Sequence, residues 1–109
     1  MEIAHGAIVL VAPPTDAGSA RAAVIVQADL FNADHATVTV CPLTNVVGGE
    51  ALFRVAISPQ EHTGLTVECE VQVDRITSVR RDRIIRVLGH ASATRMEQVD
   101  QALRRWLAL

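Results

Sequence analysis

The chain has 109 residues, of which 50% are hydrophobic and 20% are charged. This length suits a single domain over residues 1–109, and the apolar content excludes intrinsic disorder, because disordered chains lack the apolar surface that offsets the entropy of folding. The formal net charge of -2 excludes a general electrostatic attraction to nucleic acids or anionic lipids.

The sequence gives no sign of a membrane segment or a metal centre. The longest apolar run, residues 7–14, is far shorter than the ~20 residues of a membrane-spanning helix, and the acidic Glu2 is wrong for a secretory signal. We therefore expect a cytosolic protein with no membrane partner. Cys41 and Cys69 are too few and too far apart for a zinc site or a disulfide framework, so we expect buried thiols, no metal and no cofactor.

The first half of the chain predicts β-strands, because short apolar or alternating runs recur in it. The expected strands cover residues 8–12, 22–27, 37–40 with an end at 41–44, and 52–57. Turn-forming residues mark the loops between them: Pro13, Pro14, Asp16, Gly18, Gly48 and Gly49.

The second half begins with a helical turn and two further strands. Ser58 and Glu61 have the spacing of a capping box with Pro59 at the first helical position, which predicts one turn of helix. Residues 67–74 alternate strictly, which predicts a strand with one apolar face and three carboxylates on the other. Residues 83–88 predict the last strand, which Gly89 is expected to stop.

A longer helix is expected at the end of the chain. Thr94 and Glu97 form a second capping-box pattern, and the apolar residues that follow lie on one stripe: Met96, Val99, Leu103, Trp106 and Leu107. We expect this stripe to pack flat on the sheet, with Trp106 as the largest single contributor to the stability gained by its burial. The pattern predicts a mainly β (α+β) domain.

The basic residues are unevenly distributed. All ten are arginines, and five of them fall within twelve residues: Arg75, Arg80, Arg81, Arg83 and Arg86. The planar guanidinium suits phosphate oxygens, so this cluster fits phosphate binding as well as it fits an ordinary solvated surface. With only three aromatic residues, RNA binding must depend on backbone and polar contacts rather than on stacking of successive bases.

Several segments that span nearly the whole chain carry a family resemblance when they are taken in order. They are residues 5–11, 14–15, 18–19, Arg21, Asp29, 31–32, 40–44, 52–55, 58–59, 63–65, 73–74, Ile76 and 86–89. Their order and spacing resemble the MazF/PemK toxin family, the ribosome-independent endoribonucleases of toxin–antitoxin modules.

The resemblance implies a small SH3-like antiparallel β-barrel with a C-terminal α-helix, as in CcdB/MazF/PemK-like proteins. It also implies a homodimer that cuts single-stranded RNA without a metal, through attack of the ribose 2′-hydroxyl on the adjacent phosphorus. A further implied partner is a cognate antitoxin whose flexible acidic tail lies over the RNA groove. The arginine-rich segment from Arg75 to Arg86 is the surface that this tail is expected to bind.

Two residues match the family's catalytic positions, Arg21 after the first loop and Thr44 at the end of the third strand. The resemblance implies that Arg21 stabilises the negative charge that builds on the phosphoryl oxygens and that Thr44 holds one of these oxygens. Gln72 and Asp74 match positions that hold or activate substrate in some relatives. The expected RNA-binding residues are Asn45, Gln72, Asp74, Arg75 and Arg80.

Two other functions remain open. One is a CcdB-like poison that binds DNA gyrase through C-terminal residues including a tryptophan, here Trp106. The other is a degenerate, non-catalytic binding module. It is favoured by Ala7 and Ala22 in place of an acidic residue and a proline, by Gln72 in place of an arginine, and by a first loop that lacks the family's Glu-Gln.

Overall fold

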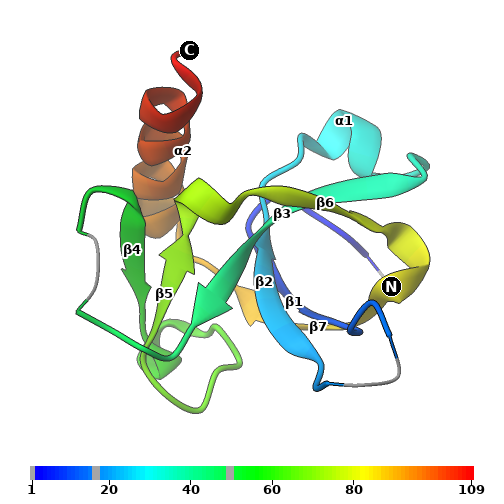
Figure 1. The fold of residues 1–109 in the computed structure, drawn as a ribbon, viewed down its shortest axis with the longest axis horizontal. Coiled ribbons are helices and arrows are strands. Elements are labelled where there is room, and N and C mark those ends of the chain that lie inside the picture. Colours follow the sequence, from blue (N-terminus) through cyan, green and yellow to red (C-terminus); the bar gives the residue numbers. More distant parts are fainter. Residues whose placement is uncertain (1, 16–17, 49–50) are drawn as a thin grey trace.

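A computed structural model describes residues 2–15, 18–48 and 51–109, so the expectations for Asp16 and Gly49 lie outside the described residues. Within these ranges, seven antiparallel strands form one bent sheet that carries a C-terminal helix (Figure 1). The strands are β1 (Ala7–Val11), β2 (Arg21–Ile25), β3 (Thr37–Thr44), β4 (Arg54–Ile57), β5 (Cys69–Gln72), β6 (Thr77–Arg80) and β7 (Ile84–His90). The helices are α1 (Asp29–Asn32) and α2 (Ala93–Leu107), with the short 3-10 helices η1 (Ala51–Phe53), η2 (Pro59–Glu61), η3 (Val73–Arg75) and η4 (Arg81–Arg83).

The long strand β3 organises the sheet, whose order is β4-β5-β3-β2-β1-β7 with β6 paired to β3. One edge of β3 pairs with β2, while the other pairs with β6 through residues 37–40 and with β5 through residues 43–44. Within the described residues β6 and β7 are joined by η4 and do not pair. The predicted mainly β sheet with a C-terminal helix is confirmed, but the expected barrel stays open along this seam.

Alternate residues of the strands feed two apolar clusters on opposite faces of the sheet. The first cluster lies under α2 and includes Val24, Cys41, Leu43, Val55, Val71 and Val99. The second fills the inside of the bend and includes Val9, Ala23, Ile25, Val38, Val40 and Val79. Because both faces of β2 are buried over residues 23–25, this strand contains a continuous apolar run, whereas β3 alternates over residues 37–40 and is continuously apolar only over residues 40–43.

The strand predicted over residues 67–74 is shorter than expected, and the reason lies in its pairing. Leu43 faces Val71 and Val40 faces Thr77, so six steps along this chain segment face three steps along β3. The surplus residues fold into η3, which ends β5 at Gln72 and starts the unpredicted strand β6. At the other end, Val67 is 51% exposed and lies outside the sheet.

The last strand passes through Gly89 instead of stopping there, because Gly89 pairs with Ile8 inside β7. A side chain at this position would place its Cβ 2.4 Å from the carbonyl carbon of Thr63. Gly89 therefore serves close packing of the loop after η2 against β7, where the backbone N–H of His90 donates to the carbonyl of His62 at 3.2 Å.

The short helix α1 was not expected, since four residues are too few to show a helical period. Buried Asn32 holds it in place by donating from Nδ2 to the carbonyl of Gln27 at 3.0 Å. The backbone N–H of His5 donates to Oδ1 of Asp29 at 2.7 Å, and this bond is the main reason that the pKa of the Asp29 carboxyl lies below its ordinary value.

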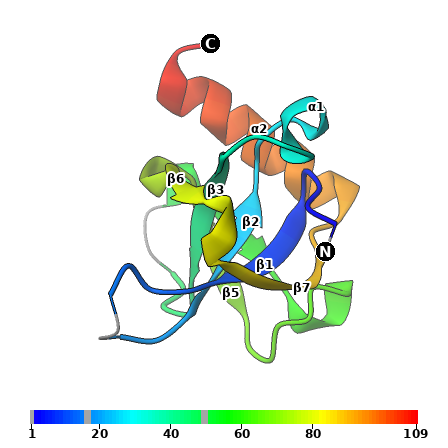
Figure 2. The same cartoon turned by 90° about the vertical axis from the view of Figure 1, so that its right-hand side faces the viewer.

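The helix α2 lies against the part of the sheet formed by β3, β4 and β5, and its last turn extends beyond the strands (Figures 1 and 2). Met96, Val99 and Ala102 are buried. Trp106 is 46% exposed and contacts Phe53 edge-on with ring centroids 5.0 Å apart, so the predicted burial of Trp106 is only partial. The prediction of an apolar stripe on this helix is confirmed, but the sheet ends before the last turn of the helix, so the end of the stripe stays partly exposed.

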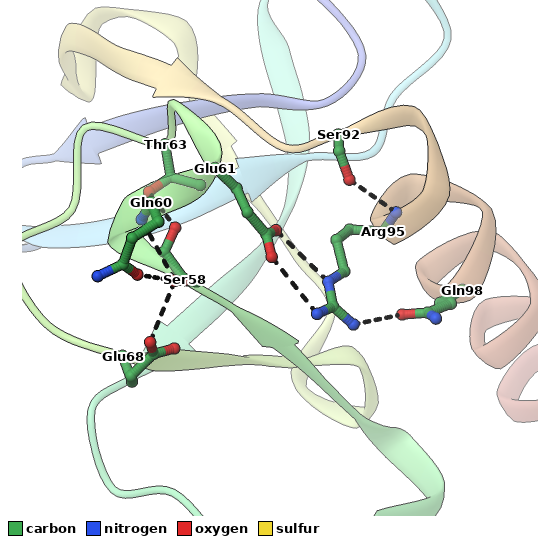
Figure 3. Close-up of polar contacts among 8 residues, drawn as sticks. All are labelled: Ser58, Gln60, Glu61, Thr63, Glu68, Ser92, Arg95 and Gln98. Carbon is green, nitrogen blue, oxygen red and sulfur yellow. Dashed lines mark hydrogen bonds and ion pairs between the residues drawn. The ribbon is translucent and has the colours of Figure 1, made fainter.

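Both predicted helix starts lie close together in the structure (Figure 3). The turn at η2 is confirmed, with Ser58 as its N-cap and Pro59 as its first residue. Glu61 does not complete a capping box but pairs with Arg95 of α2 at 3.4 Å. The N-cap of α2 is Ser92, whose Oγ accepts from the backbone N–H of Arg95 at 3.1 Å, so the prediction of Thr94 as the cap is wrong.

The observed cap gives a direct prediction for stability. Ser92→Ala should lower the free energy of unfolding by about 1 kcal/mol, because the first turn loses an acceptor for its unpaired N–H groups. Thr94→Ala, in the first turn of the same helix, should change it by less than about 0.5 kcal/mol. Urea denaturation of both variants checks this, and equal effects at the two positions would contradict the assignment of the cap.

None of the helices in the described part of the chain is both long enough and apolar enough to cross a membrane.

Candidate functional site

The two expected catalytic residues lie on neighbouring strands. Arg21 begins β2 and is exposed, and Thr44 ends β3 and is half-buried. The pairing of β2 with β3 runs from Ile25 opposite Val40 to Ala23 opposite Pro42, so Arg21 and Thr44 each lie two residues beyond its last pair. Because residues two apart on a strand share a face, both side chains project from the face that Ala23 and Pro42 share. Arg21 and Thr44 thus lie on one face of the sheet, at the neighbouring ends of β2 and β3.

A hollow of about 320 Å³ opens beside Arg21. Its apolar lining includes Val11, Ala23, Val40 and Val79, and Pro42 extends it toward the strand end that carries Thr44. Arg83 also lines the hollow, but its guanidinium donates to the carbonyl of Ala12, from Nε at 3.2 Å. A guanidinium at the rim of an apolar hollow can bind an anion while the hollow accepts an attached apolar or planar group.

The hydroxyl of Thr44 is oriented by its own loop. Its Oγ1 accepts a hydrogen bond from the backbone N–H of Val46 at 3.1 Å. A hydroxyl that accepts in this way keeps its own hydrogen for donation. Asn45 follows directly and is exposed. The strand end can therefore offer a fixed O–H donor to an oxygen of a bound anion.

A polar face continues from Thr44 across β5 to β4. The register sets Glu70 between Thr44 and Ala56 and sets Gln72 opposite Arg54. The intervening residues Leu43, Val55 and Val71 belong to the cluster under α2, so these polar side chains project from the opposite face. Asp74 joins them from η3, with Oδ1 at 3.9 Å from Nε of Arg54. Gln72 and Asp74 thus lie on the face that carries Thr44.

Arg54 and Glu70 belong to this face but were not expected there from the sequence. The alternation of residues 67–74 indicates only that Glu70 lies on the polar side of a strand, and such a side normally faces water. Arg54 stood in a family-like segment without an assigned role. Strand alternation indicates that each lies on a polar face, but only the register shows that the faces are the same one.

The expected arginine cluster is divided by the fold. Arg80 faces Thr37 at the far end of β3, about 23 Å along the strand from Thr44 at the usual rise per residue, and it pairs with Asp82 at 2.6 Å. Arg81 donates to the carbonyls of His35 and Asn32, and these bonds anchor η4. The guanidinium of Arg83 is also bonded, because it donates to the carbonyl of Ala12. Arg75 is exposed on η3, beside Asp74. The structure does not bring Arg80 to Arg21 and Thr44.

Both cysteines are buried, as expected. Burial raises the pKa of the Cys41 thiol to about 12, with the charge of Asp74 as a smaller cause, and burial also raises the pKa of Cys69. Among residues 2–15, 18–48 and 51–109, no group of three His, Cys, Asp or Glu side chains is arranged to hold a metal ion.

The raised thiol pKa values predict lower stability at alkaline pH. In the folded state the thiol of Cys41 stays protonated up to about pH 12, whereas in the unfolded chain it ionises from its ordinary pKa of 9.0, so stability falls as pH rises above 9. The expected loss from Cys41 approaches about 1.4 kcal/mol per pH unit above pH 9, until the folded thiol ionises. The chain has no tyrosine and no lysine to obscure this range. Urea denaturation between pH 8 and 10.5 checks the slope, which Cys41→Ala should reduce; an unchanged slope would contradict it.

The chain matches the model of the PemK-like, MazF-like toxin of type II toxin–antitoxin systems over residues 4–107. It is 34% identical over 100 residues to endoribonuclease MazF9 of Mycobacterium tuberculosis, covering 87% of this chain and 84% of the relative. It is also 34% identical over 92 residues to the probable endoribonuclease MazF of Mycolicibacterium smegmatis, covering 84% of each.

Solved structures share the fold. The Mycobacterium tuberculosis toxin MazF-mt6 superimposes with a TM-score of 0.80 at 21% identity, covering 94% of this chain and 97% of that one. A MazE-MazF crystal structure (Form-II) from Deinococcus radiodurans gives a TM-score of 0.84 at 22% identity, covering 100% and 99% of the two chains.

Proposed function

Because the chain belongs to the PemK-like, MazF-like toxin family of type II toxin–antitoxin systems, we propose that it is an endoribonuclease toxin that cleaves single-stranded RNA. The observation that supports the proposal within this chain is that a guanidinium and a hydroxyl, Arg21 and Thr44, occupy neighbouring strand ends on one face of the sheet. The relatives in which this activity is named are 34% identical over most of the chain.

The proposed reaction needs charge stabilisation above all. The 2′-oxygen of a ribose forms a bond to the adjacent phosphorus while the bond from phosphorus to the 5′-oxygen breaks; the 2′-proton is lost and the leaving oxygen gains one. The products are a 2′,3′-cyclic phosphate and a 5′-hydroxyl. The guanidinium of Arg21 stabilises the charge on the non-bridging oxygens, and the Thr44 hydroxyl donates to one of them. The hollow beside Arg21 accommodates a neighbouring nucleotide.

The proposed partners follow from family membership. We expect a homodimer in the cytoplasm, and a cognate antitoxin whose flexible acidic tail covers the RNA-binding face. The exposed side chains of Arg21 and Arg75 give such a tail cationic contacts. Light scattering at micromolar concentration should give twice the chain mass of 11.7 kDa, and a monomer would contradict the dimer.

The activity is tested by incubating the pure protein with RNA in an excess of chelator. Cleavage should persist, because the proposed chemistry uses only the protein's own groups. Intact RNA under these conditions, with and without added divalent cations, would overturn the proposed function. RNA that is cleaved only when cations are added would overturn its metal independence.

The gyrase-poison alternative has one supporting observation, since 46% of Trp106 remains exposed at the end of α2. The other part of its ring packs on Phe53, and the relatives named above are endoribonucleases. A gyrase supercoiling assay separates the two functions, because we expect no inhibition by the protein at concentrations that cleave RNA.

A further inference from the structure

Three charged side chains on the polar face of β4, β5 and η3 have unpaired atoms. Nε of Arg54, Oε1 of Glu70 and Oδ1 of Asp74 are shielded from solvent, and each has no hydrogen-bond partner among the described residues. The side chains of Arg54 and Asp74 are 17% and 29% exposed. Most buried polar atoms in a folded protein are paired, so these three atoms have hydrogen-bonding capacity that a bound group can use.

The three groups are held by rigid parts of the fold. Arg54 and Glu70 occupy diagonal positions on the paired strands β4 and β5. The other carboxylate oxygen of Glu70, Oε2, accepts from the backbone N–H of Gly48 at 3.0 Å, which limits its rotation. Asp74 faces Arg54 across 3.9 Å from η3, which is too long for a hydrogen bond.

The net charge of these three side chains disfavours phosphate as their ligand. Two carboxylates accompany one guanidinium, so the local net charge is negative and repels an anion. What the set offers is an excess of hydrogen-bond acceptors, because carboxylates only accept and a guanidinium only donates. The complementary ligand carries at least two N–H hydrogens beside one acceptor atom.

Among the groups of an RNA strand, the bases with an exocyclic amino group meet this requirement. Cytosine, adenine and guanine each place an amino group next to a ring nitrogen or a carbonyl oxygen, whereas uracil has one N–H between two carbonyl groups. Single-stranded RNA exposes these edges to proteins. Thr44 lies on the same face and neighbours Glu70 in the register, so a base bound here belongs to a nucleotide close to the phosphate at Arg21 and Thr44.

We infer that Arg54, Glu70 and Asp74 form a base-reading site that selects a nucleotide whose base carries an exocyclic amino group. This inference rests on the proposed function, since it assigns a sequence preference to the same RNA-binding face. Arg54 donates to the acceptor atom of the base edge, and the two carboxylates accept from its N–H groups. The neighbouring amide of Gln72 lies opposite Arg54 and borders the site.

The test measures binding separately from cleavage. Fluorescence anisotropy at fixed salt gives the affinity of the protein for labelled RNA decamers of cytidine, adenosine or uridine. The cytidine and adenosine decamers should bind about tenfold more tightly than the uridine decamer, as expected for one well-paired base edge. Asp74→Asn, Glu70→Gln and Arg54→Lys, which keep shape and have their folding checked by circular dichroism, should each reduce this ratio toward one.

The matched control is Arg105→Met, which removes a charge from an exposed residue of α2 and should leave the ratio unchanged. Equal binding of the three decamers by the unaltered protein would overturn the inference. So would a uniform loss of affinity for all three decamers in the Arg54 and Asp74 variants, which would indicate a phosphate contact. Cleavage of a mixed-sequence RNA is measured in parallel, so a protein that binds selectively but does not cut overturns the ribonuclease and not the base-reading site.

Discussion

Arg21→Ala is expected to lower the rate of RNA cleavage by roughly 10²- to 10³-fold, the usual effect of removing one donor to the charge that develops in a transition state. Arg21 lines the hollow, and Thr44 ends the neighbouring strand on the same face, so in the proposed reaction the guanidinium would stabilise the charged oxygens. Because Arg21 is exposed, its replacement should change the free energy of unfolding by less than about 0.5 kcal/mol, which separates the loss of activity from a loss of folding.

Two companion variants sharpen this measurement. Arg21→Lys should recover part of the rate, since it restores the charge but not the paired N–H donors of the guanidinium. Arg105→Ala, on α2 and away from this face, should cleave at the original rate. Binding of a substrate with a 2′-deoxy block at the cut site should fall less than about tenfold in Arg21→Ala, as expected for one lost phosphate contact. A cleavage rate unchanged by Arg21→Ala would remove this residue from the mechanism.

The largest expected effect on stability is at Gly64. This residue has φ at +74°, and an added Cβ would lie 2.1 Å from the carbonyl oxygen and 2.6 Å from the carbonyl carbon of Leu88. Both atoms are backbone of β7, so no side-chain rotation relieves the overlap. Gly64→Ala should therefore lower the free energy of unfolding by about 3 kcal/mol or more, a large fraction of the stability of a small domain.

Gly48 provides a matched control for this prediction. Its φ is +86°, but nothing lies within 4 Å of an added Cβ. Gly48→Ala should then cost only the left-handed strain of about 1 kcal/mol. Urea denaturation of the two variants compares them directly. Equal losses would mean that the loop after η2 moves away from β7 at little cost, which would contradict the close packing described above.

Local sequence pattern predicted most strands and the terminal helix, because burial of alternate or continuous apolar residues leaves a periodic trace. It could not predict how β5 and β6 share one edge of β3, since that depends on a mismatch in the number of residues on the two strands. The continuation of β7 through Gly89 was hidden for a similar reason. A glycine is needed at this position because the backbone of Thr63, which is distant in sequence, packs against it, and not because the strand ends there.

The residues of the candidate site also include some that the sequence predicted and some that only the fold revealed. Arg21 and Thr44 were identified by a family resemblance, and the register of β2 on β3 gives them a shared face. Arg80 was included because it lies near other arginines in the sequence, yet β6 carries it to the far end of β3. Arg54 was missed because its relation to Asp74 arises only when η3 returns the chain beside β4. Sequence proximity was a poor guide to the polar residues, whose positions depend on strand pairing.

The most direct test of the central claim uses two RNA oligonucleotides that differ by one oxygen. The first is cut by the protein at a mapped position in excess chelator, and the second carries a 2′-deoxyribose immediately before that position. The first should give a fragment ending in a 2′,3′-cyclic phosphate, and the second should stay intact at that bond because the attacking hydroxyl is absent. Cleavage of both, or a fragment ending in a free 3′-hydroxyl, would contradict the account.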